Sequence, residues 1–128
     1  MVSSRTTVSY EEYMRRWKAN ARGVDLNYNF AANWEGINVS LTHPSANGYK
    51  GTNPLSEPES QAIANLIQGT GFNAVINYHA MGNVIYWDTQ NNQKAAESKA
   101  LANAVHALNG YSVLGSKGVG GLKDWLQQ

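Results

Sequence analysis

The sequence predicts an α/β fold in which a mixed, largely parallel sheet is flanked by helices. Two apolar runs, at residues 72–79 and 84–87, lie between two segments of helical periodicity, and a third apolar run follows at residues 111–114. Strands that alternate with helices in this way are typical of parallel sheets. The chain has 128 residues and neither an internal repeat nor a linker, so we expect one domain over residues 1–128.

The first third of the chain carries few regular patterns. Residues 1–16 mix polar and aromatic side chains and are expected to be irregular, although residues 10–17 have the composition of a short helix. Residues 24–27 are interpreted as a short strand that enters a loop. Residues 31–54 are rich in Asn, Gly, Ser, Thr and Pro without a steady period, which predicts a long surface loop of the kind that often carries function.

The first predicted long helix begins near Ser56, a residue type that favours helix starts, with Pro58 in its first turn and Glu59 three positions after the serine. Gly69 and Gly71 are expected to end this helix. Its periodicity places four apolar side chains on one face, namely Ala62, Ile63, Leu66 and Ile67.

The apolar run at residues 72–79 shows little polar alternation, which is typical of a central strand covered on both faces. A Gly-Asn pair then predicts a turn before the strand at residues 84–87.

A second helix is predicted over residues 91–108, with Gly110 just past its end. The strand at residues 111–114 follows, then a glycine-rich loop at residues 115–121 and the start of another helix at residues 122–128. The buried stripe of the second helix is expected to consist of Leu101, Ala104, Val105 and Leu108.

Composition narrows the classes of function. Hydrophobic residues make up 42% of the chain and charged residues 15%, which is a globular mixture. Ten basic and nine acidic side chains, with no basic stripe, argue against nucleic acid as a partner. Because the chain has no cysteine, disulfides, thiolate zinc sites and cysteine nucleophiles are excluded.

Targeting signals are also missing from the sequence. No apolar run approaches the ~20 residues that a membrane-spanning helix needs, so we expect no membrane span. Residues 1–7 are polar and contain no signal-peptide core, which by itself indicates the cytoplasm. If further residues precede Met1, export to the cell envelope stays open.

His79 is the most informative single residue, because it ends the predicted central strand. Ligands gather at the carboxyl ends of strands in open α/β sheets, and an imidazole there can bind a metal or transfer a proton. The alternative is a structural histidine that satisfies a backbone hydrogen bond. His43 precedes a proline in the long loop and His106 lies beside core positions, so neither is a suitable second ligand.

Residues 22–30 form the second informative stretch, Arg-Gly-Val-Asp-Leu-Asn-Tyr-Asn-Phe. Taken alone, it is either a strand end followed by amides that hydrogen-bond a peptide, or an Asn-rich turn.

Five segments in order resemble the motifs of the zinc carboxypeptidase family, carboxypeptidase A type. They are Gly-Val-Asp-Leu-Asn-Tyr-Asn-Phe at 23–30, Tyr-Lys-Gly-Thr-Asn-Pro-Leu-Ser-Glu-Pro-Glu at 49–59, Tyr-His-Ala at 78–80, Ile-Tyr-Trp at 85–87 and Gly-Gly-Leu-Lys-Asp-Trp at 120–125. The lead-in at 17–22 is most similar to the bacterial branch that cleaves γ-D-glutamyl–L-diamino acid bonds. The resemblance therefore implies a partial zinc-carboxypeptidase-like sheet and a zinc peptidase acting on peptides, including peptidoglycan stem peptides.

The resemblance also implies roles for individual residues. His79 would be the third zinc ligand, and Asn27 would hydrogen-bond the substrate's terminal carboxylate or an equivalent backbone group. The family places an arginine after this asparagine, whereas Tyr28 stands here and cannot form a bidentate charged pair. Tyr28 therefore suits an endopeptidase, or an enzyme that recognises the substrate with other groups. Arg22 belongs to the same substrate-binding stretch, and either Arg22 or Lys18 would stabilise the oxyanion.

Several parts of the family's site have no counterpart in this sequence. The first two zinc ligands come from a His-x-x-Glu segment upstream of the asparagine motif, and the mobile tyrosine would fall near Ser116. The catalytic glutamate would lie beyond Gln128. We therefore expect a truncated peptidase domain that alone neither hydrolyses peptides nor holds zinc tightly, and whose exposed sheet edges allow self-association.

Two other functions compete with that of a zinc peptidase. A non-catalytic module would use Asn27, Tyr28 and His79 to bind peptide without cleaving it. A metal-free hydrolase with a histidine base lacks a convincing nucleophile, because Ser56 is assigned to the helix start and the sequence contains no Gly-x-Ser-x-Gly motif.

Overall fold

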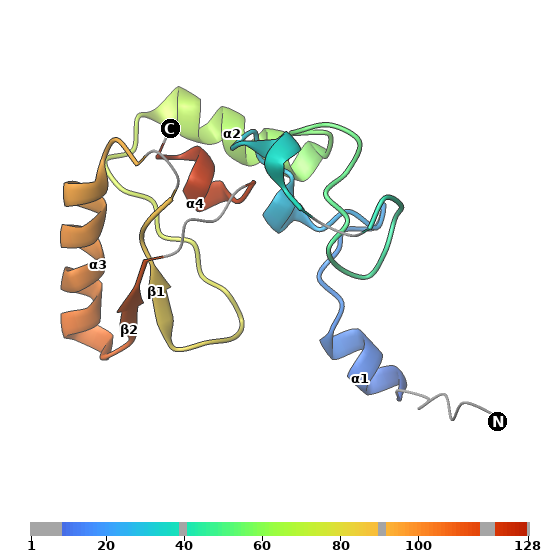
Figure 1. Cartoon of the computed structure of the whole chain (residues 1–128), viewed down its shortest axis with the longest axis horizontal. Helices are drawn as coiled ribbons and strands as arrows, with labels where there is room; N and C mark the ends of the chain where they lie inside the picture. Colours follow the sequence, from blue (N-terminus) through green and yellow to red (C-terminus); the bar gives the residue numbers. More distant parts are fainter. Residues whose placement is uncertain (1–8, 39–40, 90–91, 116–119, 128) are drawn as a thin grey trace.

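The computed structural model describes residues 9–38, 41–89, 92–115 and 120–127. Figure 1 shows α2 along the top of the molecule, α3 beside two short strands at one end, and α1 projecting at the other end. The elements, in chain order, are α1 (Tyr10–Arg15), the 3₁₀ turns η1 (Leu26–Tyr28) and η2 (Trp34–Gly36), α2 (Pro58–Thr70), β1 (Val84–Tyr86), α3 (Ala95–Asn109), β2 (Ser112–Leu114) and α4 (Leu122–Trp125).

The sheet described by the structure consists of β1 and β2, which pair in parallel. Val84 lies opposite Ser112 and Tyr86 lies opposite Leu114. The helix α3 connects the two strands and contacts both of them, as parallel pairing requires of a crossover. The predicted α/β class with a parallel sheet flanked by helices is confirmed.

Both predicted long helices are present, although Gly69 lies inside α2 and α3 begins at Ala95, after the predicted start at residue 91. The helix α2 has Pro58 in its first turn and ends at Gly71, where φ is 66°. The helix α3 ends at Gly110, where φ is 71°. The predicted capping role of Ser56 is wrong, because the residue before α2 is Glu57 and no side chain caps that end. The Ser56 hydroxyl instead donates to the Glu57 carboxylate and accepts from Asn29.

Two predicted strands are absent from the described residues. Residues 24–27 enter the 3₁₀ turn η1, because the Asp25 side chain accepts a hydrogen bond from the Asn27 backbone N–H and closes the turn. Residues 72–79 are not a strand, since no described segment pairs with them. The strands predicted at 84–87 and 111–114 are present as β1 and β2.

The irregular regions agree in part with the sequence. The described part of the 31–54 loop is irregular except for η2. The helix α1 is the short helix that the composition of residues 10–17 allows. Residues 116–119 of the predicted glycine-rich loop, including Ser116, lie outside the described residues, as do residues 1–8.

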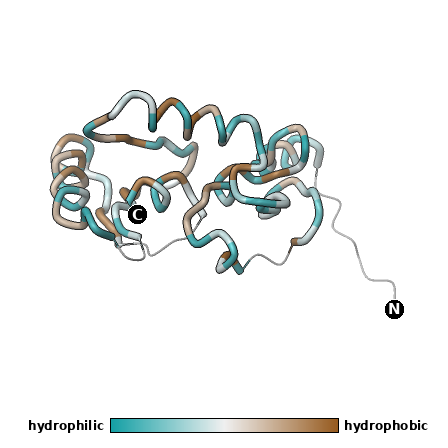
Figure 2. Tube along the Cα trace, turned by 90° about the horizontal axis from the view of Figure 1, so that it is seen from above, coloured by the Kyte–Doolittle hydropathy of each residue, from teal (hydrophilic) through white to brown (hydrophobic). Residues whose placement is uncertain are grey.

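The core lies away from the apolar faces that the periodicity predicts. Ile63 and Leu66 on α2 are 41% and 55% exposed, and Leu108 on α3 is 89% exposed. The apolar face of α2 is thus open to solvent, and the buried stripe predicted for the second helix is wrong, because the buried residue of α3 is Ala102. Figure 2 shows apolar residues recurring along the outer trace of the molecule. The buried hydrophobic residues are Val24, Phe30, Ala32, Ile37, Tyr49, Ala64 and Ala102.

Among the helices that the structure describes, none combines the length and the hydropathy needed to cross a bilayer.

Candidate substrate-binding site

The turn η1, which carries Asn27 and Tyr28, is held by the buried carboxylate of Asp25. One oxygen of Asp25 accepts the Asn27 backbone N–H at 3.2 Å, and the other accepts the Gly48 N–H at 2.9 Å. The Asp25 N–H donates to the Tyr49 carbonyl at 2.8 Å. A single acidic side chain therefore ties the turn to the far end of the long loop.

Asn29 follows the turn and is completely buried. Its Nδ2 lies 3.0 Å from both the Lys50 carbonyl and the Ser56 hydroxyl, and 3.3 Å from the Asn53 carbonyl. Its Oδ1 accepts the Glu57 N–H at 3.3 Å. This amide therefore uses its donors and its acceptor to join η1, the long loop and the start of α2.

Glu57 supplies a second buried carboxylate, with only 2% of its surface exposed. It accepts from the Asn20 side-chain amide and from the Ser56 hydroxyl, both at 2.8 Å. The Nε of Arg22 lies 3.7 Å from Glu57 Oε2, while the Arg22 side chain is 68% exposed. Glu57 is thus paired with both a neutral donor and a cation, which offsets part of the cost of burying its charge.

Lys18 differs from Arg22 in its surroundings. The Lys18 backbone N–H donates to the Ala46 carbonyl at 2.8 Å, and Lys18 is exposed. Within the described part of the chain, its ammonium forms neither a hydrogen bond nor an ion pair. Of the two candidate cations, Lys18 is therefore the one without a carboxylate partner.

The Gly120–Gly121 pair packs directly against η1. The Phe30 N–H donates to the Gly120 carbonyl at 2.9 Å, and the Gly120 N–H donates to Ala32 at 2.8 Å. A Cβ on Gly120 would lie 2.1 Å from Ile37 Cδ1, and one on Gly121 would lie 3.4 Å from the Asn27 carbonyl. This close packing explains physically why the motif requires glycine.

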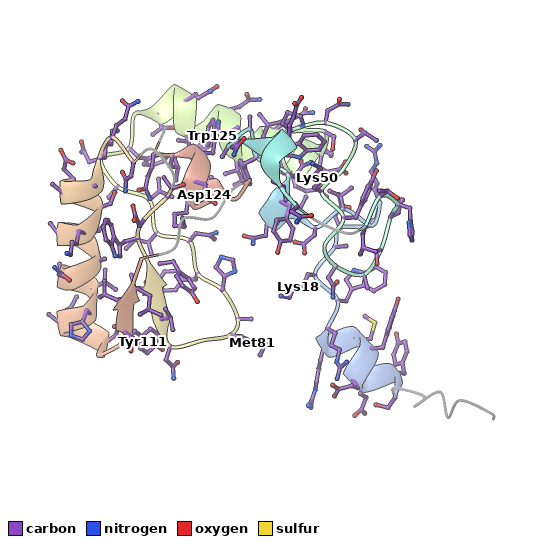
Figure 3. The ribbon with its side chains drawn as sticks, viewed as in Figure 1. Lys18, Lys50, Met81, Tyr111, Asp124 and Trp125 are labelled. Carbon is purple, nitrogen blue, oxygen red and sulfur yellow. The ribbon has the colours of Figure 1, made fainter. Side chains whose placement is uncertain are left out.

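The helix α4 continues from the glycine pair and extends this contact. The Gly121 N–H donates to the Asp124 carboxylate at 3.2 Å, and Lys123 pairs with the same carboxylate and donates to the Asp88 carbonyl. The Trp125 ring lies 5.9 Å from the Phe30 ring. Figure 3 shows Asp124, Trp125 and Lys50 in the upper, packed part of the molecule, with Lys18 and Met81 below.

Sequence reasoning assigned no role to Asn29 or Glu57, although both lie inside the quoted motifs. The signal that identifies them is their pairing across the chain, which the motif spacing does not reveal. Asn27 is exposed and Tyr28 is half-buried, so this buried network presents both side chains on a fixed turn.

His79 lies apart from this network. Its side chain is exposed, and its Nε2 is 3.2 Å from the Asn77 side-chain amide. The structure brings Asn27, Tyr28 and the glycine pair together, and no hydrogen bond connects His79 with them in the described part of the chain. His106 instead contacts the Tyr111 carbonyl at 2.7 Å.

A zinc ion does not fit the residues that the structure describes. Groups of three or more His, Asp or Glu side chains that could hold a metal ion are absent from residues 9–38, 41–89, 92–115 and 120–127. A catalytic zinc site uses about three protein ligands, and His79 offers one.

Comparison with known proteins gives the family. The sequence profile of the zinc carboxypeptidases matches residues 4–126. The chain therefore belongs to the zinc carboxypeptidase family.

Its relatives include bacterial and animal proteins. The chain is 38% identical over 114 residues to gamma-D-glutamyl-L-diamino acid endopeptidase 1 of Lysinibacillus sphaericus, covering 88% of this chain and 28% of that protein. It is 32% identical to bovine carboxypeptidase O over 120 residues, covering 80% of this chain and 32% of that protein. It is 44% identical to murein peptide amidase A of Escherichia coli K12 over 69 residues, covering 48% of this chain and 28% of that protein. The chain thus spans about a third or less of the length of these relatives.

Proposed function

We propose that this chain is the substrate-binding part of a zinc metallopeptidase and that it contributes His79 as one zinc ligand. The observation that carries the proposal is the buried network of Asp25, Asn29 and Glu57 beneath the Asn27 turn. Burying these polar groups costs stability unless their hydrogen bonds are satisfied, and here they are satisfied in a way that fixes one exposed turn. A fixed polar turn is what recognition of a peptide backbone requires.

The proposed substrate is a peptide, in particular a peptidoglycan stem peptide. The names of the bacterial endopeptidase and of murein peptide amidase A support this class. The Asn27 amide has a donor and an acceptor that match a peptide group. Tyr28 carries no positive charge, so we propose endopeptidase or amidase specificity in preference to recognition of a terminal carboxylate.

Between the two candidate oxyanion cations, we favour Lys18. Arg22 lies beside the buried Glu57 carboxylate, so part of its charge is already compensated. Among the described residues Lys18 has no such partner, and we propose that its ammonium is available for a developing negative charge.

Alone, the 128-residue chain is proposed to be inactive. It offers one of the three protein ligands that a catalytic zinc needs, and no residue of the chain is assigned as the general base that an activated water needs.

A hybrid protein tests the proposal. The matched segment of the L. sphaericus endopeptidase is replaced by this chain, and both bound zinc and hydrolysis of a γ-D-glutamyl–diamino acid peptide are measured. The hybrid should hold zinc and cleave the peptide, and His79→Ala should remove both properties. His43→Ala is the matched control, because His43 is exposed and lies in the long loop. A His79→Ala hybrid that keeps its zinc would refute the assignment of His79.

A peptide-binding module without catalysis is the second candidate. The observation that favours it is that the described residues contain no group of metal ligands. In that case the hybrid stays inactive and metal-free, while the 128-residue chain still binds the peptide in a calorimetric titration.

A further inference from the structure

The sequence contains the tripeptide Asn-Gly-Tyr twice, at residues 47–49 and 109–111. An asparagine followed by glycine is prone to backbone rearrangement, because glycine has no side chain to shield its amide nitrogen. In this reaction the glycine nitrogen attacks the side-chain carbonyl carbon of the asparagine. Because the same residues follow both asparagines, the folded structure is expected to decide which of them reacts.

Neither exposure nor glycine conformation separates the two copies. Asn47 and Asn109 are both exposed. Gly48 has a φ of 74° and Gly110 has a φ of 71°. The difference lies in the group that accepts the glycine N–H.

Asn109 is held in an unreactive arrangement as the last residue of α3. The Gly110 N–H donates to the His106 carbonyl at 2.7 Å, and the Asn109 Oδ1 accepts the Tyr111 N–H at 2.9 Å. A backbone carbonyl does not take up the amide proton. Attack by the Gly110 nitrogen would also break the hydrogen bonds that end the helix.

Asn47 has different surroundings. It lies in an irregular segment, and its side-chain amide forms no hydrogen bond within the described part of the chain. The Gly48 N–H donates to Oδ2 of the buried Asp25 at 2.9 Å. A carboxylate at about 2.6–3.2 Å from the donor atom is within reach to act as a general base. Asp25 is therefore placed to accept the proton that the Gly48 nitrogen loses when it attacks.

We propose that Asn47 is a site of spontaneous backbone rearrangement and that Asp25 is its general base. The Gly48 nitrogen forms a bond to Cγ of Asn47 while its proton passes to Asp25 Oδ2. The bond from Cγ to the side-chain nitrogen then breaks, and that nitrogen takes the proton from Asp25 and leaves as ammonia. One water molecule opens the resulting succinimide at either carbonyl carbon, which gives aspartate or isoaspartate.

The rearrangement changes a segment that supports two parts of the candidate site. The Ala46 carbonyl accepts the Lys18 N–H at 2.8 Å, and the Gly48 N–H holds Asp25. Isoaspartate adds one carbon to the backbone between these two contacts and also adds a negative charge. The consequence for binding rests on the proposed function: the spacing between Lys18 and the Asn27 turn changes, and peptide binding weakens as the chain ages.

Peptide mapping by mass spectrometry tests the site without reference to zinc or peptide binding. After incubation at neutral pH and physiological temperature, Asn47 should convert about tenfold faster than Asn109. Isoaspartyl methyltransferase should label the product at residue 47. In concentrated urea the two asparagines should convert at similar rates, because the fold no longer distinguishes them. Equal rates in the folded chain, or the same inequality in urea, would overturn the proposal.

Asp25→Asn tests the base, because an amide oxygen can still accept the Gly48 N–H but does not take up its proton. This variant should slow the conversion of Asn47 about tenfold, with circular dichroism confirming the fold. Asp124→Asn is the matched control, since Asp124 is also a buried carboxylate that accepts a glycine N–H, that of Gly121. It should leave the rate at Asn47 unchanged. An unchanged or faster rate in a folded Asp25→Asn chain would overturn the role of Asp25.

The natural chain gives a second readout that does not depend on a folded variant. Conversion of Asn109 needs hydroxide to remove the amide proton, so its rate should rise steeply from neutral to mildly alkaline pH. Conversion of Asn47 should rise less steeply, because a carboxylate accepts the proton. Parallel pH dependences of the two rates would contradict the role of Asp25.

Discussion

The Asp25 carboxylate accepts the backbone N–H of Asn27, two residues further along the chain, at 3.2 Å. Its second oxygen holds the N–H of Gly48 at 2.9 Å. The candidate substrate amide therefore stands on a turn whose shape depends on one buried acid. The stability of this turn and the chemistry of the site can be separated by substitutions.

Replacement of Asp25 by alanine should destabilise the fold by about 3 kcal/mol, because two backbone donors lose a charged acceptor. Urea denaturation followed by circular dichroism measures the change. Glu97→Ala is the matched control, since Glu97 is exposed on α3 and forms no ion pair or hydrogen bond among the described residues. Its effect should stay within about 0.5 kcal/mol. Equal effects of the two variants would contradict the role given to Asp25.

Asn29→Ala should lower the free energy of unfolding by about 3 kcal/mol or more, since buried groups on Lys50, Ser56 and Glu57 lose their partner. Hydrogen exchange should accelerate across residues 48–57. Asn103→Ala on the exposed side of α3 serves as the comparison and should leave that exchange unchanged. Unaltered protection of residues 48–57 in the Asn29 variant would argue against the network.

Gly120→Ala combines a positive φ of 79° with a Cβ that would lie 2.1 Å from Ile37 Cδ1. Gly82→Ala has a φ of 95° but meets no atom within 4 Å, so it isolates the backbone strain, about 1–2 kcal/mol. The Gly120 variant should therefore lose clearly more stability in thermal unfolding. Adding Ile37→Ala to it should relieve the clash, and the double variant should then lose only the strain energy and the contacts of the buried Ile37 side chain. If the two glycine variants unfold alike, the close packing is not a determinant of stability.

Zinc should not remain on the 128-residue chain. A single imidazole is too few ligands for tight binding. After incubation with zinc and desalting, metal analysis should find far less than one zinc per chain, and His79→Ala should not alter the thermal midpoint. Stoichiometric zinc on a monomer would contradict the proposal.

Substitution of Tyr28 tests substrate selection. The unmodified chain should bind a peptide with a free terminal carboxylate and its amide about equally, because a phenol makes no bidentate charged pair. Tyr28→Arg should favour the free carboxylate about tenfold, which corresponds to about 1.4 kcal/mol. Tyr10→Arg, on the exposed α1, controls for the added charge. A preference in both variants would indicate nonspecific attraction.

Local signals in the sequence were sufficient for much of the fold. Proline in the first turn marks the start of α2, and glycine after the last turn marks its end. Glycine likewise ends α3. The alternation of these helices with apolar runs predicts the parallel pairing of β1 and β2. Each of these signals depends on residues that are close together in the sequence, which is why the sequence alone predicts these elements.

Only the tertiary structure decided the remainder. Residues 24–27 were predicted as a strand, yet the Asp25 side chain folds them into a turn that the loop at Gly48 and Tyr49 supports. The strand predicted at 72–79 needs a neighbour, and no described segment provides one. Asn29 and Glu57 acquire their roles from partners 21 to 37 positions away. Hydrogen bonds over such separations depend on how the chain folds back on itself, so the sequence around each partner does not predict them.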